Sequence, residues 1–250
     1  MTTSKSYNQA LFNFANGLVL SNDATTPNTL LDVAAGLILD STQTYQLALT
    51  APAVINSAIN GLNGLDTGAI AASTVYYVYL VGDPVDLSPT GAMISASTTP
   101  LLPVGYGAYA LIGFVTTDSS KHFLKGIWNN GNGTARTFMY DSPQATAVTA
   151  GNATVATAVD LSAFVPKFDG KLVWMSTSYV PASAGNQFKM QPANGTGFPV
   201  VITGQVSAVA VTGQSYLASS LVAGVQKINY LVGNAGDAVA INVLGYMFYI

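Results

Sequence analysis

Residues 73–83 read STVYYVYLVGD, and the rest of the sequence is best interpreted outward from this stretch. In an extended strand, alternate side chains point to opposite faces. Val75, Tyr77 and Tyr79 therefore share one face, and Tyr76 and Val78 lie on the other. Both faces are apolar or aromatic, whereas a half-exposed strand alternates apolar with polar residues. The pattern predicts a strand that is either sandwiched between two layers of its own chain or covered by another copy of the protein.

The composition indicates a β-rich chain with little surface charge. Only 8% of the 250 residues are charged and 50% are hydrophobic, whereas about 25% of residues are charged in a typical globular domain. Such a chain is too apolar to be disordered, so much of its surface must be uncharged polar residues or be buried by partners. The eleven acidic residues are all Asp, which favours turns and caps over helical surfaces.

Several functional classes are disfavoured by what the sequence lacks. The net charge is -3 with no basic cluster, so we expect no nucleic-acid partner. The sequence has no cysteine, which excludes disulfides, thiolate catalysis and Cys-ligated zinc. The opening MTTSKSYNQALFNFANG lacks the pattern of a secretory signal, and Pro, Gly and Gln interrupt the long uncharged stretch between Lys189 and Lys227. We expect no secretion, no membrane insertion and no cofactor.

Turn-forming clusters divide the first half of the chain into short apolar runs, which is typical of successive strands. The spacing of apolar residues predicts short helices at residues 4–15 and 51–64. Beyond these, we expect strands at residues 73–83, 108–116, 123–128 and 134–140. The region 142–152 has few large apolar residues, which predicts a domain boundary. The N-terminal domain would span residues 1–142, with a short anchor segment at its start, and the C-terminal domain residues 143–250.

The second half has turn signals about every ten residues, the rhythm of a β-sandwich or barrel. Its predicted strands are residues 155–161, 171–179, 187–192, 200–206, 225–231 and 238–250. The last of them, AVAINVLGYMFYI, is so apolar that it must be covered inside a sheet or at a subunit contact. The predicted fold class is mainly β: two β-sandwich or barrel-like domains, the second jelly-roll-like, with one or two short helices in the N-terminal part.

Three ordered segments of the first half resemble a module of bacteriophage tail-fibre and other virion proteins. They are GLVLSNDATTPNTLLDVAAGLILDSTQTYQLAL, GLDTGAIAASTVYYVYLVGD and LPVGYGAYALIGFVTTDSSKHFL, which together cover roughly residues 17–128. The chain departs from the module at Val75, where an aromatic residue is usual, and at GAYAL, which replaces basic residues. The second half looks like the small β-sandwich domains at the ends of phage fibre and decoration proteins.

This resemblance implies a structural role without a fixed catalytic site. The expected function is a non-enzymatic, oligomeric tail-fibre or fibre-like appendage on the virion surface, made in the host bacterial cytoplasm. A capsid decoration or head-fibre protein is the alternative. A polysaccharide depolymerase spike and a secreted carbohydrate-binding module are less favoured. The expected partners are further copies of the chain in a homotrimer, capsid or tail proteins, and a host surface glycan. The candidate interface residues are Tyr76, Tyr77, Tyr79, Tyr246, Phe248 and Ile250.

The search for catalytic and metal-binding residues leaves none assigned. His122 is the only histidine, so a two-histidine metal site is impossible within one chain, and a surface turn or a subunit contact is favoured over a catalytic triad. Glycoside hydrolysis needs two carboxylates about 5–10 Å apart. The aspartate pairs nearest in sequence occur in turn-like contexts that favour backbone capping; they are Asp83 with Asp86, Asp32 with Asp40, and Asp160 with Asp169. Calcium binding at a turn aspartate stays open, although no EF-hand loop is present.

A last set of candidates is aromatic. Tyr106, Tyr109, Tyr179 and Tyr216 could stack on sugars of a host glycan. Interface or core positions are favoured for them, because aromatic residues serve those roles more often.

Overall fold

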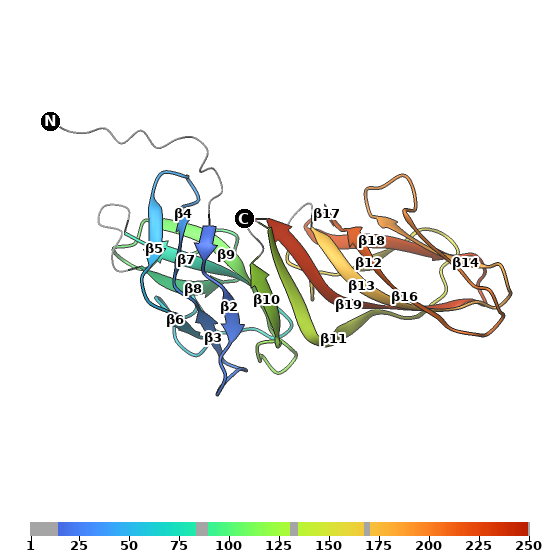
Figure 1. The fold of residues 1–250 in the computed structure, drawn as a ribbon, viewed down its shortest axis with the longest axis horizontal. Coiled ribbons are helices and arrows are strands. Elements are labelled where there is room, and N and C mark those ends of the chain that lie inside the picture. Colours follow the sequence, from blue (N-terminus) through green and yellow to red (C-terminus); the bar gives the residue numbers. More distant parts are fainter. Residues whose placement is uncertain (1–14, 84–89, 131–134, 168–170, 250) are drawn as a thin grey trace.

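The computed structural model describes residues 15–83, 90–130, 135–167 and 171–249, and every regular element in these residues is a β-strand. Two parts lie side by side along the long axis of the molecule (Figure 1). We call residues 15–124, which contain β1 to β9, the N-terminal module, and residues 126–249, which contain β10 to β19, the C-terminal sandwich. The β-rich fold expected from the composition is therefore confirmed.

The N-terminal module is built from three small antiparallel sheets with the strand orders β1-β4-β5, β2-β3-β6 and β8-β7-β9. Its strands are β1 (Ala15–Gly17), β2 (Leu20–Asn22), β3 (Leu30–Val33), β4 (Gly36–Leu39), β5 (Gln46–Leu49), β6 (Ala53–Asn56), β7 (Val75–Gly82), β8 (Gly91–Ser95) and β9 (Ala108–Thr116). Short strands separated by turns match the short apolar runs of the sequence.

Strand β7, the tyrosine-rich stretch, is buried on both faces by its own chain. On one face, Gly82 lies against the side chain of Leu47 in β5. On the other, the Tyr77 ring lies 5.3 Å from Phe114, whose ring is 4.7 Å from Phe248 of the C-terminal sandwich. Of the two alternatives that the sequence left open, a sandwich between layers of one chain is the arrangement observed.

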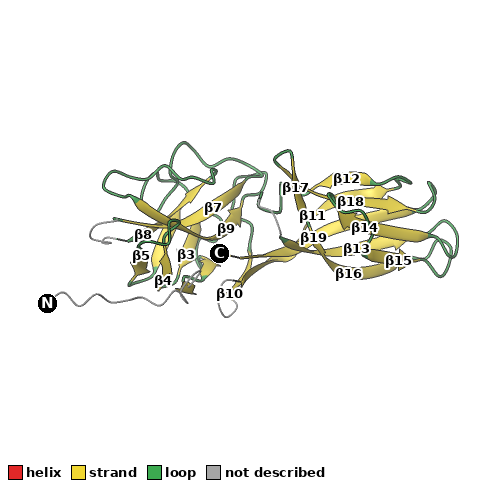
Figure 2. Cartoon of the chain, turned by 90° about the horizontal axis from the view of Figure 1, so that it is seen from above, coloured by secondary structure: helices red, strands yellow, loops and turns green. Residues whose placement is uncertain are grey.

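The C-terminal sandwich consists of two sheets with the orders β10-β11-β19-β13-β16 and β12-β18-β14-β15, and β17 pairs with β18 at one end (Figure 2). Its strands are β10 (Gly126–Asn130), β11 (Ala135–Gly151), β12 (Thr157–Asp160), β13 (Leu172–Val180), β14 (Gln187–Pro192), β15 (Val200–Thr203), β16 (Val211–Ala218), β17 (Ser220–Val222), β18 (Val225–Val232) and β19 (Ala238–Tyr249).

The core of this sandwich follows from strict alternation along its strands. Residues of β13 and β18 are alternately half-buried and buried, as expected of strands with one face toward a core. The Tyr179 ring of β13 lies 5.9 Å from the Phe188 ring of β14, so the two sheets face each other. Gly245 lies beside a register shift between β13 and β19, where a Cβ atom would collide with the carbonyl oxygen of Phe138 in β11. Only glycine fits at this close approach.

Side chains from the C-terminal sandwich cap backbone carbonyls of the N-terminal module. Strand β9 is an edge strand of its sheet, so carbonyls on its outer side need donors from elsewhere. Arg136 Nη1 donates to the carbonyl oxygens of Ile112 (3.0 Å) and Leu18 (2.9 Å), and Trp128 Nε1 donates to that of Phe114 (3.1 Å). The two parts are therefore joined by buried hydrogen bonds as well as by aromatic packing.

The helix predicted at residues 51–64 is wrong. The segment forms β6, which pairs with β3, followed by turns. Val54 and Ile55 are β-branched and favour a strand. The Asn56 side chain accepts a hydrogen bond from the Ala58 amide, which replaces a helical bond. Gly61 then adopts a left-handed φ of 93°.

Other predictions concern residues that the structure places differently or does not describe. Residues 1–14, which contain most of the other predicted helix and the anchor segment, lie outside the described residues. The predicted boundary after residue 142 falls within β11, a strand of the C-terminal sandwich. Strands β1, β8, β16 and β17 were not predicted.

The capping role of Arg136 predicts a large loss of stability on its removal. Arg136→Leu is expected to lower the free energy of unfolding by on the order of 3 kcal/mol, because buried carbonyl oxygens lose a charged donor. Arg136→Lys keeps the charge but not the planar fork, so its loss should be smaller. Denaturant unfolding followed by tryptophan fluorescence measures both. An unchanged midpoint for Arg136→Leu would contradict this role.

Candidate functional site

Four of the six candidate interface residues, Tyr77, Tyr79, Tyr246 and Phe248, belong to one ring cluster around Phe114 at the junction between the two parts, whereas the Tyr76 hydroxyl accepts a hydrogen bond from the Ala71 amide within the N-terminal module. The side chains of Tyr76, Tyr77, Tyr79, Tyr246 and Phe248 are all buried within the chain, and Ile250 lies outside the described residues. The Tyr77 hydroxyl donates to the carbonyl oxygen of Lys167 (3.2 Å), across the junction. The ring cluster around Phe114 joins the two parts of one chain, and all five described candidates are buried, so any surface that contacts another copy must be formed by other residues.

Lys171 is buried in the same aromatic cluster. Its side chain is 1% exposed, and its Nζ lies 4.6 Å from the centre of the Phe114 ring and 5.2 Å from that of Phe248. Burial lowers the pKa of Lys171 from its ordinary 10.5 to about 7, because a low-dielectric environment disfavours the charged form. Contact with two ring faces partly offsets that cost.

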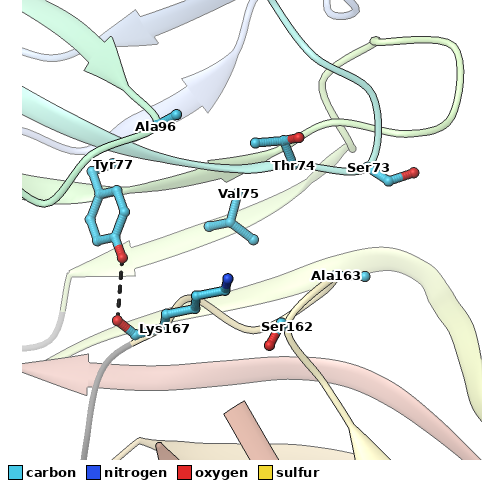
Figure 3. A pocket seen from close by; sticks show the side chains of 8 residues that line it. All are labelled: Ser73, Thr74, Val75, Tyr77, Ala96, Ser162, Ala163 and Lys167. Atoms are coloured by element: carbon cyan, nitrogen blue, oxygen red, sulfur yellow. Dashed lines mark hydrogen bonds between the residues drawn. The ribbon is translucent and has the colours of Figure 1, made fainter. Parts of the chain in front are cut away.

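A pocket of about 310 Å³ opens beside this junction (Figure 3). Ser73, Thr74, Val75 and Tyr77 line it from the N-terminal module, and Ser162 and Lys167 from the C-terminal sandwich. Its walls are hydroxyl groups and short alkyl side chains, with a single amine at Lys167. Such a lining offers hydrogen bonds but no paired acid and base.

His122 lies in a turn that Asp118 closes. The Asp118 carboxylate accepts hydrogen bonds from the amides of Ser120 and His122, both 2.8 Å. The imidazole Nδ1 lies 3.6 Å from the same carboxylate, and the His122 side chain is 47% exposed. The pair therefore closes a surface turn, as the sequence predicted.

Most described aspartates act as backbone caps. Asp23, Asp40 and Asp160 each accept hydrogen bonds from amides within the next five residues. Asp237 is buried and accepts hydrogen bonds from the Tyr179 hydroxyl, the Asn186 side chain and two amides. Burial alone would raise the pKa of Asp237, but these donors outweigh it and lower that pKa below its ordinary value. Capping accounts for these carboxylates.

Two members of the predicted carboxylate pairs, Asp86 and Asp169, lie outside the described residues. Within the described residues, no group of three or more His, Cys, Asp or Glu side chains is placed to hold a metal ion. No helix in those residues is long and apolar enough to cross a membrane.

The four aromatic candidates, expected in loops, divide into interior and surface positions, and three of them, Tyr109, Tyr179 and Tyr216, lie on strands. Tyr179 is buried, and Tyr109 packs edge-on against Tyr79 with ring centres 5.6 Å apart. Tyr106 is half-buried. Tyr216 is 63% exposed, and its ring lies nearly parallel to that of Trp174, with centres 5.6 Å apart and planes 12° apart.

Sequence reasoning missed Trp174 as a partner of Tyr216. The alternation of LVWMSTSYV places Trp174 on the face opposite Val173 and Met175, and this signal was readable. The partner strand β16 was not predicted, so the pair could not be.

Comparisons with known proteins leave the family open. No protein-family model and no curated protein matches the chain. Among solved structures, the chain is similar to a carbohydrate-binding module of Cellvibrio mixtus lichenase 5A, with a TM-score of 0.24 and 14% identity over 48% of this chain and 86% of that one. A CBM4 structure gives a TM-score of 0.24 and 12% identity over 50% and 78%. A structure of infectious bursal disease virus gives a TM-score of 0.23 and 10% identity over 94% of this chain and 70% of that one. Similarities this weak carry no argument about function.

The lowered pKa of Lys171 predicts a pH-dependent stability. Between pH 7 and about 10, the unfolded chain holds a proton on this amine that the folded chain releases, so stability should rise with pH by about 1 kcal/mol per pH unit. Lys171→Met should flatten that rise and be the more stable protein at pH 7. The change in stability with pH is measured from the midpoints of denaturant unfolding at pH 7, 8 and 9. An equal rise with pH in the wild-type protein and in Lys171→Met would contradict the role given to Lys171.

Proposed function

We propose that the chain is a non-enzymatic structural protein of a bacteriophage virion surface, acting as an oligomeric, fibre-like building block. The proposal rests on the resemblance of residues 17–128 to the phage fibre module. The observation that supports it in the structure is the buried junction between the two parts. Arg136 of β11 donates hydrogen bonds to carbonyl oxygens of Leu18 and Ile112 in the N-terminal module, and β19 pairs along β11, from Tyr249 opposite Ala135 to Val239 opposite Gly151.

Such a union suits a part that transmits force. A flexible linker would leave the two parts free to move, whereas here buried hydrogen bonds and aromatic rings would have to break before they separate. The ends of a fibre or decoration protein are loaded whenever a particle meets a surface. A chain with one continuous core carries load through buried area rather than through ion pairs.

The surface of the chain also fits assembly with uncharged partners. Leu101 and Val104, in the loop before β9, and Val206 and Val209, in the loop before β16, are exposed. Few charged side chains surround them, because the whole chain has only 19 Asp, Lys and Arg residues, 11 acidic and 8 basic. Apolar side chains held on loops are available to contact another copy or a capsid or tail protein.

The first test is the presence of the chain in purified phage particles. We expect mass spectrometry to detect it there and cryo-electron microscopy to place it on the particle surface, at the tail for a fibre or on the capsid for a decoration protein. In solution, light scattering should give three times 25.8 kDa if the assembly is a homotrimer. Absence from particles that infect normally would overturn the proposal.

An enzymatic spike makes a different prediction. A depolymerase would release new reducing ends from host polysaccharide, and the release would stop on replacing Asp83 or Asp160 by Asn. We expect no release by the wild-type protein. Release that these substitutions abolish would make the chain an enzyme.

A further inference from the structure

An aromatic pair lies on the outer face of the C-terminal sandwich, outside the N-terminal module. Trp174 of β13 is directly opposite Tyr216 of β16 in the antiparallel register. Among the described residues, β16 is the last strand of its sheet. The two rings are stacked in nearly parallel planes, and Tyr216 is 63% exposed, so part of its ring is open to solvent.

A row of amide and hydroxyl side chains lies beside the pair. Two residues further along β13, Ser176 is opposite Gln214 of β16 and Asn242 of β19. All three side chains lie on the outer face, since none is buried and their neighbours along each strand point to the core. Successive rows on one face are about 7 Å apart, close to the width of a sugar ring.

This face is electrically neutral. Strands β13, β16 and β19 contain no Asp, Glu, Lys, Arg or His. An anionic or cationic ligand would find no countercharge on these strands, whereas a neutral, hydroxyl-rich ligand would find the exposed part of the Tyr216 ring and hydrogen-bonding amides.

We propose that the face formed by Trp174, Tyr216, Ser176, Gln214 and Asn242 binds a neutral glycan. The apolar C–H face of a pyranose ring stacks on Tyr216, and its hydroxyl groups exchange hydrogen bonds with Gln214, Ser176 and Asn242. The inference deepens the proposed function, because a surface glycan is what a virion appendage would contact on a cell. It assigns that contact to the C-terminal sandwich.

A second copy of the chain is the competing occupant. A contact between proteins is built around side chains that fill pockets on the partner. The polar row here is flat, and its amides would need matching partners in such a contact. The glycan supplies those partners through its own hydroxyl groups.

The test is affinity electrophoresis of the full chain in gels that contain laminarin, dextran, galactomannan or hydroxyethylcellulose, with polygalacturonate as the charged comparison. We expect at least one neutral polysaccharide to retard the wild-type protein. Tyr216→Ala should raise the dissociation constant roughly tenfold or more, and Gln214→Ala should raise it less. Tyr249→Ala is the matched control, since Tyr249 is 55% exposed and lies on β19 away from the pair; it should leave binding unchanged.

Fluorescence gives an independent reading. The chain has two tryptophans, and Trp128 is buried at the junction. Binding should therefore change the emission of the wild-type protein but not that of Trp174→Phe, which keeps an aromatic ring at this position.

Three outcomes would overturn the inference: no retardation by any of the four neutral polysaccharides, retardation that Tyr216→Ala does not weaken, or a fall in oligomer mass for Tyr216→Ala without glycan binding, which would make this face a contact between copies. None of these outcomes bears on whether the chain is found in particles. Failure of the glycan site and failure of the virion proposal are therefore distinguishable.

Discussion

The donation of Arg136 and Trp128 to the edge of β9 is the interaction on which the arrangement of the whole chain depends. A buried edge strand is stable only if the carbonyl groups on its outer side accept hydrogen bonds from other donors. Here the donors come from β10 and β11 of the other part of the chain. The N-terminal module therefore cannot bury β9 without the C-terminal sandwich in place. The rest of the junction follows, because the position of Arg136 brings Phe248 and Lys171 onto the Phe114 ring.

This junction shows where so apolar a chain buries many of its hydrophobic residues. The two aromatic faces of β7 are covered from both sides by the chain itself, by Leu47 on one and by the Phe114 cluster on the other. Much of the apolar content is thus buried within the chain, and the outer face of β13 and β16 carries uncharged polar side chains such as Ser176, Ser178, Thr212 and Gln214 beside Trp174 and Tyr216. The scarcity of charge is then a property of the surface, and it leaves the Trp174 face neutral.

Local sequence patterns predicted most of the strands, but they could not predict which strands pair across long sequence distances. The bounds of β9 and β14 were predicted to the residue, because turn signals flank continuous or alternating apolar runs. The helix at residues 51–64 was wrong because Val54 and Ile55 fit either period over so short a run. Strand β16 was missed because Gly213, Gln214 and Ser215 resemble a turn. The candidate interface residues were recognised as needing cover, but the sequence could not tell cover by the same chain from cover by another. Nor could it show that Arg136, one of few basic residues, is buried.

The placement of β19 between β11 and β13 has a consequence for how the chain acquires its structure. Ala135 pairs with Tyr249, and every strand of the second sheet lies between them in the sequence. Pairings of such sequence separation are slow to form, because loop closure precedes any gain from contact. During synthesis, β11 and β13 emerge with the space between them vacant and their edges open to strands of neighbouring chains. Rapid, high-level expression should therefore favour aggregation through these two strands, and slower synthesis should favour the native sheet.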